Sequence, residues 1–206
     1  QVNTRLRELN ASSKGLQQSN GAGFSGLSSF VTRFTVGIGV AIGAVKTFFS
    51  SLSGSGKLEQ LNIAFETFLG SADKAKKVIA DLRKFADVTP FETEQVNQAG
   101  RALLAFGFSA EELIPTLTRI GDVAAGTGKD FNELALIYGK AKTQGLIQGE
   151  ELNQLAEAGI PIYAELAKVL GVNEKQIRKL GEQGKISFAS LEQVFRNLTG
   201  EGGRFA

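Results

Sequence analysis

The GTGK segment at positions 126–129 has the residue types that surround phosphate groups in nucleotide-binding loops, namely glycines and a lysine. Such a loop also needs a glycine at position 123 and a serine or threonine at position 130, and it follows a β-strand. The chain has Val123 and Asp130 there, and no strand is expected before them. We interpret the segment as a turn between two helices and expect no cofactor.

Two pairs of adjacent carboxylates, Glu111-Glu112 and Glu150-Glu151, are the residues best suited to acid and base catalysis of the glycosidase kind. Both pairs are expected in the first turn of a helix, where the helix dipole favours the charged form. The chain also has no His and no Cys, which removes the commonest general base and all thiolate chemistry. We predict no catalytic residue, no metal site and no enzymatic activity.

Asp122 stands out because it follows Gly121 in the middle of an otherwise apolar helical segment. We favour a structural role, in which its carboxylate accepts a hydrogen bond or pairs with Arg101 or Arg119 at the edge of the core. The alternative is an exposed acid that binds a partner protein.

These side chains are carried by short amphipathic helices. Apolar residues recur at helical spacing along residues 58–200, and no window shows sustained alternation of apolar and polar residues. Glycines divide the pattern into short pieces. The expected helix ends are Gly70, Gly107, Gly126, Gly145, Gly159, Gly171, Gly184 and Gly200. The predicted fold class is all-α, with a compact helical domain over residues 57–206.

The starts of these helices are also readable. Pro90 fixes its own φ and moves Thr89 out of the helical region, so a stiff turn is expected before a helix capped by Thr93. Ser109 begins a capping box with Glu112. The remaining predicted caps are Ser71, Asp130, Asn173 and Ser187, with Pro161 as the first residue of its helix.

Three glycines, Gly100, Gly121 and Gly139, fall inside predicted helices, where each costs about 1 kcal/mol relative to alanine. We expect neighbouring helices to cross closely at these positions. Phe91 and Tyr163 lie beside proline-containing turns and are interpreted as core anchors, with interface hot spots as the alternative.

The segment from Leu58 to Phe205 resembles the tape measure domain of bacteriophage tail proteins. The resemblance rests on LEQLNIAFETFLGS, FADVTPFE, LLAFGFSAEEL, RIGDVAAGTG, YGKAKTQGLIQGEELNQLAEAGIPIY, GKISFASLEQVF and LTGEGGRF, which occur in the family's order and spacing. The residues that match its structural motifs are Thr89, Pro90, Phe91, Gly107, Gly121, Asp122, Gly145, Gly149, Gly159, Ile160, Pro161 and Gly184.

The resemblance implies a structural protein that lies in a few copies in the lumen of the phage tail. There it sets tube length during assembly in the host cytoplasm and leaves ahead of the DNA at infection. The implied partners are the tail tube protein, tail tip or baseplate proteins and tail assembly chaperones. Because the chain lacks Met and begins with Gln1, we expect it to be a piece of a longer polypeptide.

Charge separates the first part of the chain from the rest. Residues 1–57 hold six Lys and Arg against one Glu, whereas residues 58–206 hold 17 against 20 acids. We predict a long extended helical arm over residues 1–56 that pairs with copies of itself. Six cations without interleaved aromatic residues do not favour nucleic-acid binding, and no sequence-specific nucleic acid is expected as a partner.

Within the arm, an uncharged apolar core of 12 residues, Phe34–Val45, lies between Arg33 and Lys46. As a helix it measures about 18 Å, against about 30 Å for the hydrocarbon core of a bilayer. We favour packing against sibling copies or the tube wall. The alternative is a membrane-active module that inserts residues 24–52 in the host inner membrane. The residues expected at either contact are Phe34, Ile38, Gly39, Ile42, Gly43 and Val45.

Overall fold

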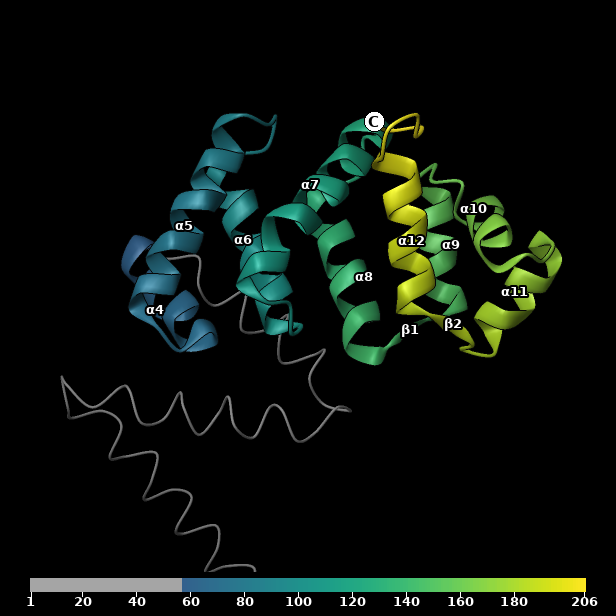
Figure 1. Cartoon of the computed structure of the whole chain (residues 1–206), viewed down its shortest axis with the longest axis horizontal. Helices are drawn as coiled ribbons and strands as arrows, with labels where there is room; N and C mark the ends of the chain where they lie inside the picture. The colour runs from purple at the N-terminus through teal and green to yellow at the C-terminus, as the bar shows by residue number, and fades with distance from the viewer. Residues whose placement is uncertain (1–56) are drawn as a thin grey trace, which may run out of the picture. The chain divides into compact units, whose positions relative to one another are not determined.

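Short helices joined by tight turns make up residues 57–206, the part of the chain that the structure, a computed structural model, describes (Figure 1). The predicted arm lies outside these residues. The described helices are α4 (Lys57–Leu69), α5 (Ala72–Asp87), α6 (Thr93–Ala105), α7 (Ala110–Thr127), α8 (Phe131–Gln144), α9 (Gly149–Glu157), α10 (Ile162–Leu170), α11 (Glu174–Glu182) and α12 (Phe188–Thr199). The predicted all-α class is confirmed for this part of the chain.

The helices form two groups that meet at α12. In the first group α4 packs on α5, α5 on α6, and α6 on α8, with α7 beside both α6 and α8. In the second group α9, α10 and α11 pack on one another. Helix α12 lies between the groups and contacts α7, α8 and α10 (Figure 1). A single apolar core therefore runs through both groups.

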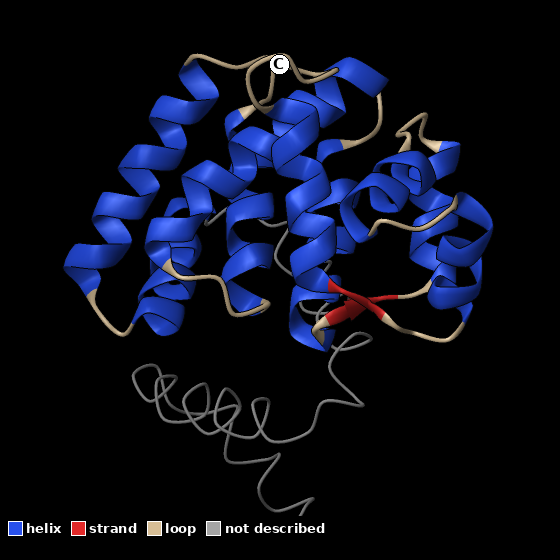
Figure 2. Cartoon of the chain, turned by 45° about the vertical axis from the view of Figure 1, so that its right-hand side comes forward, coloured by secondary structure: helices blue, strands red, loops and turns tan. Residues whose placement is uncertain are grey.

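Two strands of two residues each, which the sequence analysis did not predict, join the groups at one end of α8 and α12. Strand β1 (Leu146–Ile147) pairs antiparallel with β2 (Ile186–Ser187), with Leu146 opposite Ser187 (Figure 2). The amide of Phe188 continues the ladder by donating to the carbonyl of Gly145 at 3.0 Å. Helices α9–α11 are thus contained in a loop closed at its base by this pair.

Most predicted helix ends are correct. A glycine of positive φ follows within two residues at Gly70, Gly107, Gly145, Gly159, Gly171 and Gly184. The predicted end at Gly126 is wrong: α7 continues through it, and Gly128 ends the helix with φ 71° while its amide donates to Ala124 at 2.8 Å. Helix α12 stops before Gly200, as predicted, but there the glycine is extended at φ −80° and ψ 175°.

Five predicted N-caps are confirmed by hydrogen bonds from backbone amides to their side chains, namely Ser71, Ser109, Asp130, Asn173 and Ser187. Thr93 is the first helical residue of α6 and not its cap. The cap is Glu92, because its amide donates to the Gln95 side chain at 3.1 Å. Pro161 is likewise the cap of α10, one residue before the predicted position.

Candidate functional site

The family-motif residues lie mainly in turns, and Phe91 packs one of these turns against the core. The Thr89 hydroxyl donates to the Phe85 carbonyl at 2.9 Å, which holds the chain against the end of α5. After Pro90, the Phe91 ring stacks on Phe131 of α8, with centroids 4.2 Å apart. The turn between α5 and α6 is therefore attached to α8, about 40 residues further along the chain.

Gly121 makes room for that ring. A Cβ built on Gly121 would lie 2.9 Å from Cε2 of Phe91 and 3.6 Å from Phe85. The same holds at Gly100, where a Cβ would lie 2.9 Å from Leu82, and at Gly139, where it would overlap Phe106. The close approach expected at these three glycines is present, and it is made by side chains of neighbouring helices or turns.

Asp122 is half-buried on α7 and lines a surface hollow with Arg204 and Phe205. Burial raises the pKa of its carboxyl. No ion pair of Asp122 is present among residues 57–206, and Arg119, one of the two partners that the sequence suggested, instead lies 3.7 Å from Glu192.

Gly107 and Gly159 each reverse the chain so that the next residue enters the core. In both turns the amide after the glycine donates to a carbonyl five residues back, from Phe108 to Leu103 at 3.1 Å and from Ile160 to Leu155 at 3.2 Å. This is the Schellman arrangement, and it satisfies carbonyls at the helix end. Phe108 and Ile160 are both buried.

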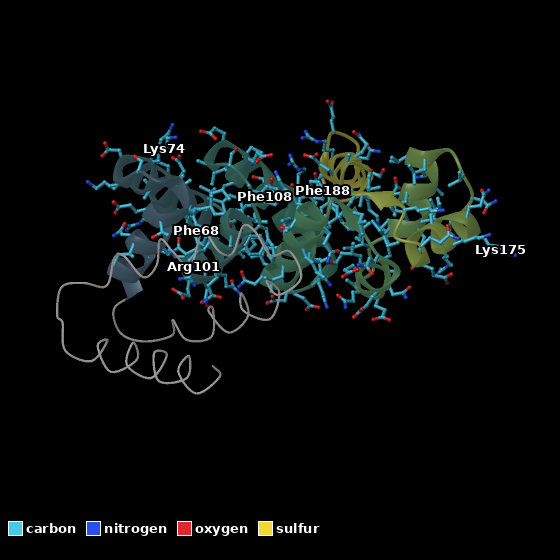
Figure 3. All side chains as sticks on the ribbon, turned by 90° about the horizontal axis from the view of Figure 1, so that it is seen from below. Phe68, Lys74, Arg101, Phe108, Lys175 and Phe188 are labelled. Atoms are coloured by element: carbon cyan, nitrogen blue, oxygen red, sulfur yellow. The ribbon has the colours of Figure 1, made fainter. Side chains whose placement is uncertain are left out.

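The motif glycines 145, 149 and 184 surround the two strands. The carbonyl of Gly145 accepts a hydrogen bond from the amide of Phe188. Gly149 lies against α11, since a Cβ built on it would be 3.5 Å from backbone atoms of Gly181 and Glu182. Gly184 ends α11 just before β2. Near this end of α12, Figure 3 shows Phe108 and Phe188 close together, and their rings meet edge to face at 6.3 Å.

The GTGK segment joins two helices, as predicted, but Gly126 and Thr127 still belong to α7 and only Gly128 and Lys129 lie in the turn. Lys129 forms an ion pair with Glu133 at 2.7 Å, and Asp130 accepts the Glu133 amide at 2.8 Å. Gly128 supplies the left-handed residue that ends α7. The Thr127 hydroxyl donates to the Val123 carbonyl at 2.7 Å, so both polar side chains of the segment have partners in the adjoining helices.

Neither predicted carboxylate pair has the environment of a general acid. Glu112 accepts hydrogen bonds from Lys142 and from the Ser109 amide, both at 2.8 Å, and these lower its pKa. The pKa of the exposed Glu111 is lowered too, first by a backbone hydrogen bond and then by Ser109. A general acid needs the opposite shift.

Glu151 differs from its exposed neighbour Glu150 because it is buried and pairs with Lys140 of α8. This ion pair, which connects α8 to α9, was not predicted from the sequence. Nor was the contact of Glu192, which lies 2.8 Å from Arg196 and 3.7 Å from Arg119 between α12 and α7. The pair of Lys140 and Glu151 thus joins the two groups of helices, and Arg119 with Glu192 joins α7 to α12.

Among residues 57–206, no three His, Cys, Asp or Glu side chains are grouped so that they could hold a metal ion. Within the same residues, no helix is both long and apolar enough to cross a membrane. The predicted self-association or membrane residues lie outside the described part of the chain. They are Phe34, Ile38, Gly39, Ile42, Gly43 and Val45.

Comparison with known proteins identifies what these turns and helices belong to. The family described as "Tape measure protein" matches residues 50–206. The chain is also similar to the "Probable tape measure protein" of Escherichia phage Mu, with 29% identity over 167 residues. That similarity covers 78% of this chain and 24% of the relative, so the chain spans about a quarter of the relative's length. No solved structure matches.

The family match covers all of α4–α12 and more than half of the chain, and it includes each motif turn described above. The chain belongs to the tape measure protein family and is a structural component of the bacteriophage tail.

Proposed function

We propose that this chain is part of a tape measure protein that lies in the lumen of the tail, sets tube length during assembly and leaves ahead of the DNA at infection. The family match over residues 50–206 is the observation that carries the proposal. The role is structural and not catalytic, in keeping with carboxylates that are paired, or whose pKa is lowered by hydrogen bonds.

The folded body of residues 57–206 is one point along the length-setting protein, the ruler, and does not itself set the length. A straight helix rises about 1.5 Å per residue, so a chain measures length when its helices are long and extended. Residues 57–206 instead turn back after every helix, the longest of which has 18 residues. The measuring length belongs to the remaining three quarters of a protein such as the phage Mu relative.

The partners follow from the same proposal. They are the tail tube protein, tail tip or baseplate proteins and tail assembly chaperones, with the protein present in a few copies that associate through residues 1–56. Assembly takes place in the host cytoplasm. The body would act as a fixed anchor against one of these partners while the rest of the protein extends along the tube.

Tail length after in-frame deletions in the parent gene tests the proposal. Deletions outside residues 57–206 should shorten the tails, as seen by electron microscopy, by up to about 1.5 Å per residue removed. As the matched control, a Gly/Ser loop with the same number of residues is inserted directly after Gly171, in the turn between α10 and α11. This insertion should leave tail length unchanged.

Tails of unchanged length after the deletions would refute the ruler. Lengthening in proportion to the turn insertion would show instead that the body itself is extended in the tube. Partitioning of a peptide of residues 24–56 into liposomes is the separate measurement for the membrane-active alternative.

A further inference from the structure

A hollow on the surface between α5 and the first turns of α7 has an apolar floor and a rim of lysines. Val78 and Phe85 of α5 and Ile114 of α7 contribute the floor, and Val88 extends it past the end of α5. All the residues that line it belong to the described part of the chain. None of the motif turns discussed above lies in it.

Val88 is the largest departure from ordinary burial in this region. Its side chain is 82% exposed, against 41% for Leu136 and 37% for Leu170, the other large hydrophobic residues exposed among residues 57–206. Val78 and Phe85 of the floor are nearly buried, so Val88 supplies the most exposed apolar side chain of the hollow.

Four of the lining residues of α5, and Val88 just after its end, follow one stripe. Lys74, Val78, Asp81, Phe85 and Val88 are spaced by four, three, four and three residues, which places them on one face. The stripe covers 14 intervals, or about 21 Å at 1.5 Å per residue. A helix of about four turns would match this length along α5, and Ala110, Glu111 and Ile114 of α7 would border it over about one turn.

The rim carries a small net positive charge. Lys74, Lys77 and Lys84 line the hollow, against the acids Asp81 and Glu111. Asp81 lies 3.6 Å from Lys84 and offsets it, and Glu111 on the opposite wall offsets one more lysine, so one positive charge remains. The rest of the exposed surface of α5 adds the cations Lys76 and Arg83 and the acids Asp73 and Asp87, which balance. Figure 3 shows Lys74 near the edge of the described helices.

We propose that this groove binds an amphipathic helix of another protein, with apolar residues on one face and acidic residues beside them. The apolar face would cover Val88, Ile114 and the floor, and its carboxylates would meet Lys74 and Lys77. The basic residues 1–57 of this chain carry six cations and one acid, so charge disfavours them as the occupant. The inference does not depend on the ruler role.

Two peptides with the same apolar pattern test the proposal on the whole 206-residue chain. Both are labelled amphipathic helices of 18 residues, by design, with leucine at helical spacing; one carries glutamates beside the leucines and the other carries lysines. Fluorescence anisotropy should give the glutamate peptide a Kd at least tenfold lower. Lys74→Glu combined with Lys77→Glu and Lys84→Glu should reverse this preference, which loss of folding would not do.

Val88→Asp should weaken binding of the glutamate peptide about tenfold, while Leu170→Asp on α10, the matched exposed control, should leave it unchanged. Equal binding of the two peptides would overturn the proposal, as would insensitivity to Val88→Asp. Self-association that Val88→Asp abolishes would assign the groove to a second copy of the chain and overturn it too. Displacement of the peptide by short duplex DNA at stoichiometric concentration would assign the rim to phosphate and have the same consequence.

Discussion

The ring of Phe91 lies on Gly121, so closely that a Cβ at position 121 would be 2.9 Å from its Cε2 atom. The other side of the same contact is Phe131, stacked on Phe91 at 4.2 Å. The glycine thus allows a turn between two helices to dock on a third. Its cost as a helix residue, about 1 kcal/mol relative to alanine, is offset by that docking.

Whether replacement of Gly121 by alanine stabilises or destabilises the protein depends on Phe91. We expect Gly121→Ala to lower the free energy of unfolding by about 1 kcal/mol, since overpacking costs about 1–3 kcal/mol and the helix regains about 1. In a Phe91→Ala background the overlap is gone, and Gly121→Ala should stabilise the protein by up to about 1 kcal/mol. Urea denaturation of the four variants measures both effects.

Gly139→Ala provides the control, because the ring that it would meet is Phe106. Its effect should be the same with Phe91 or alanine at position 91. If the destabilisation by Gly121→Ala is also the same with phenylalanine or alanine at position 91, Phe91 does not restrict Gly121.

The ion pair between Lys140 and Glu151 should respond asymmetrically to loss of either partner. The Glu151 side chain is 5% exposed and that of Lys140 is 30% exposed. Lys140→Met leaves a buried carboxylate unpaired, at a cost of about 2–3 kcal/mol. Glu151→Gln leaves a lysine that can turn toward water, so we expect about 1 kcal/mol. Equal losses in urea denaturation would contradict this account.

Asp122 should make stability depend on pH in the sense opposite to most carboxylates. Burial raises its folded pKa above the ordinary 3.8. Its contribution to stability is therefore complete below the unfolded value and is lost as the pH rises through the folded value. Asp122→Asn should stabilise the protein at pH 7 and have no effect at pH 2.5, as measured by thermal unfolding at both values.

Glu112 is the matched comparison, because hydrogen bonds from Lys142 and the Ser109 amide lower its pKa. Its contribution is present above the unfolded value near 4.5 and is lost as the pH falls through the folded value. Glu112→Gln should thus destabilise slightly at pH 7 and not at pH 2.5. Identical pH profiles for the two variants would disprove the assignment of opposite shifts.

Phe205 should hold residues 200–206 against α7. Its amide donates to Leu198 at 2.8 Å, and its ring lies where a Cβ on Gly126 would be. Phe205→Ala, and equally Gly126→Leu, should free residues 200–206. We expect the amide of Phe205, or of the alanine that replaces it, to lose hydrogen-exchange protection while α12 stays protected. Unchanged protection in both variants would show that the ring contact does not hold this segment.

Most of the fold could be predicted from the sequence, because helix ends depend on local chemistry. Glycines of positive φ and side-chain caps are defined within a few residues, so the helix ends followed from Ser109, Asn173 and similar positions. Gly126 and Gly128 are two residues apart, and spacing alone does not say which takes the left-handed conformation. Strands of two residues show no alternation at all, which is why β1 and β2 were missed.

Contacts between distant residues were beyond such reasoning. Lys140 and Glu151 lie on different helices, and nothing in their local sequence distinguishes them from the exposed charges around them. Phe91 was expected in the core as an anchor, yet its two neighbours, Gly121 and Phe131, depend on how three helices meet. The candidate groove followed from the structure alone, because Val78 and Phe85 read as ordinary core residues of α5.

The pairing of β1 with β2 also decides how the fold would yield to a pull along the chain. Force arriving through α8 and α12 acts on Leu146 and Ser187, which face each other at the same end of the two strands. The backbone hydrogen bonds between the two strands would open one after another, and not all together in shear. The pair therefore adds little mechanical strength, and release of α9–α11 also requires α12 to part from α10. If the protein leaves through a narrow tube under tension, as proposed above, unfolding would begin at this pair.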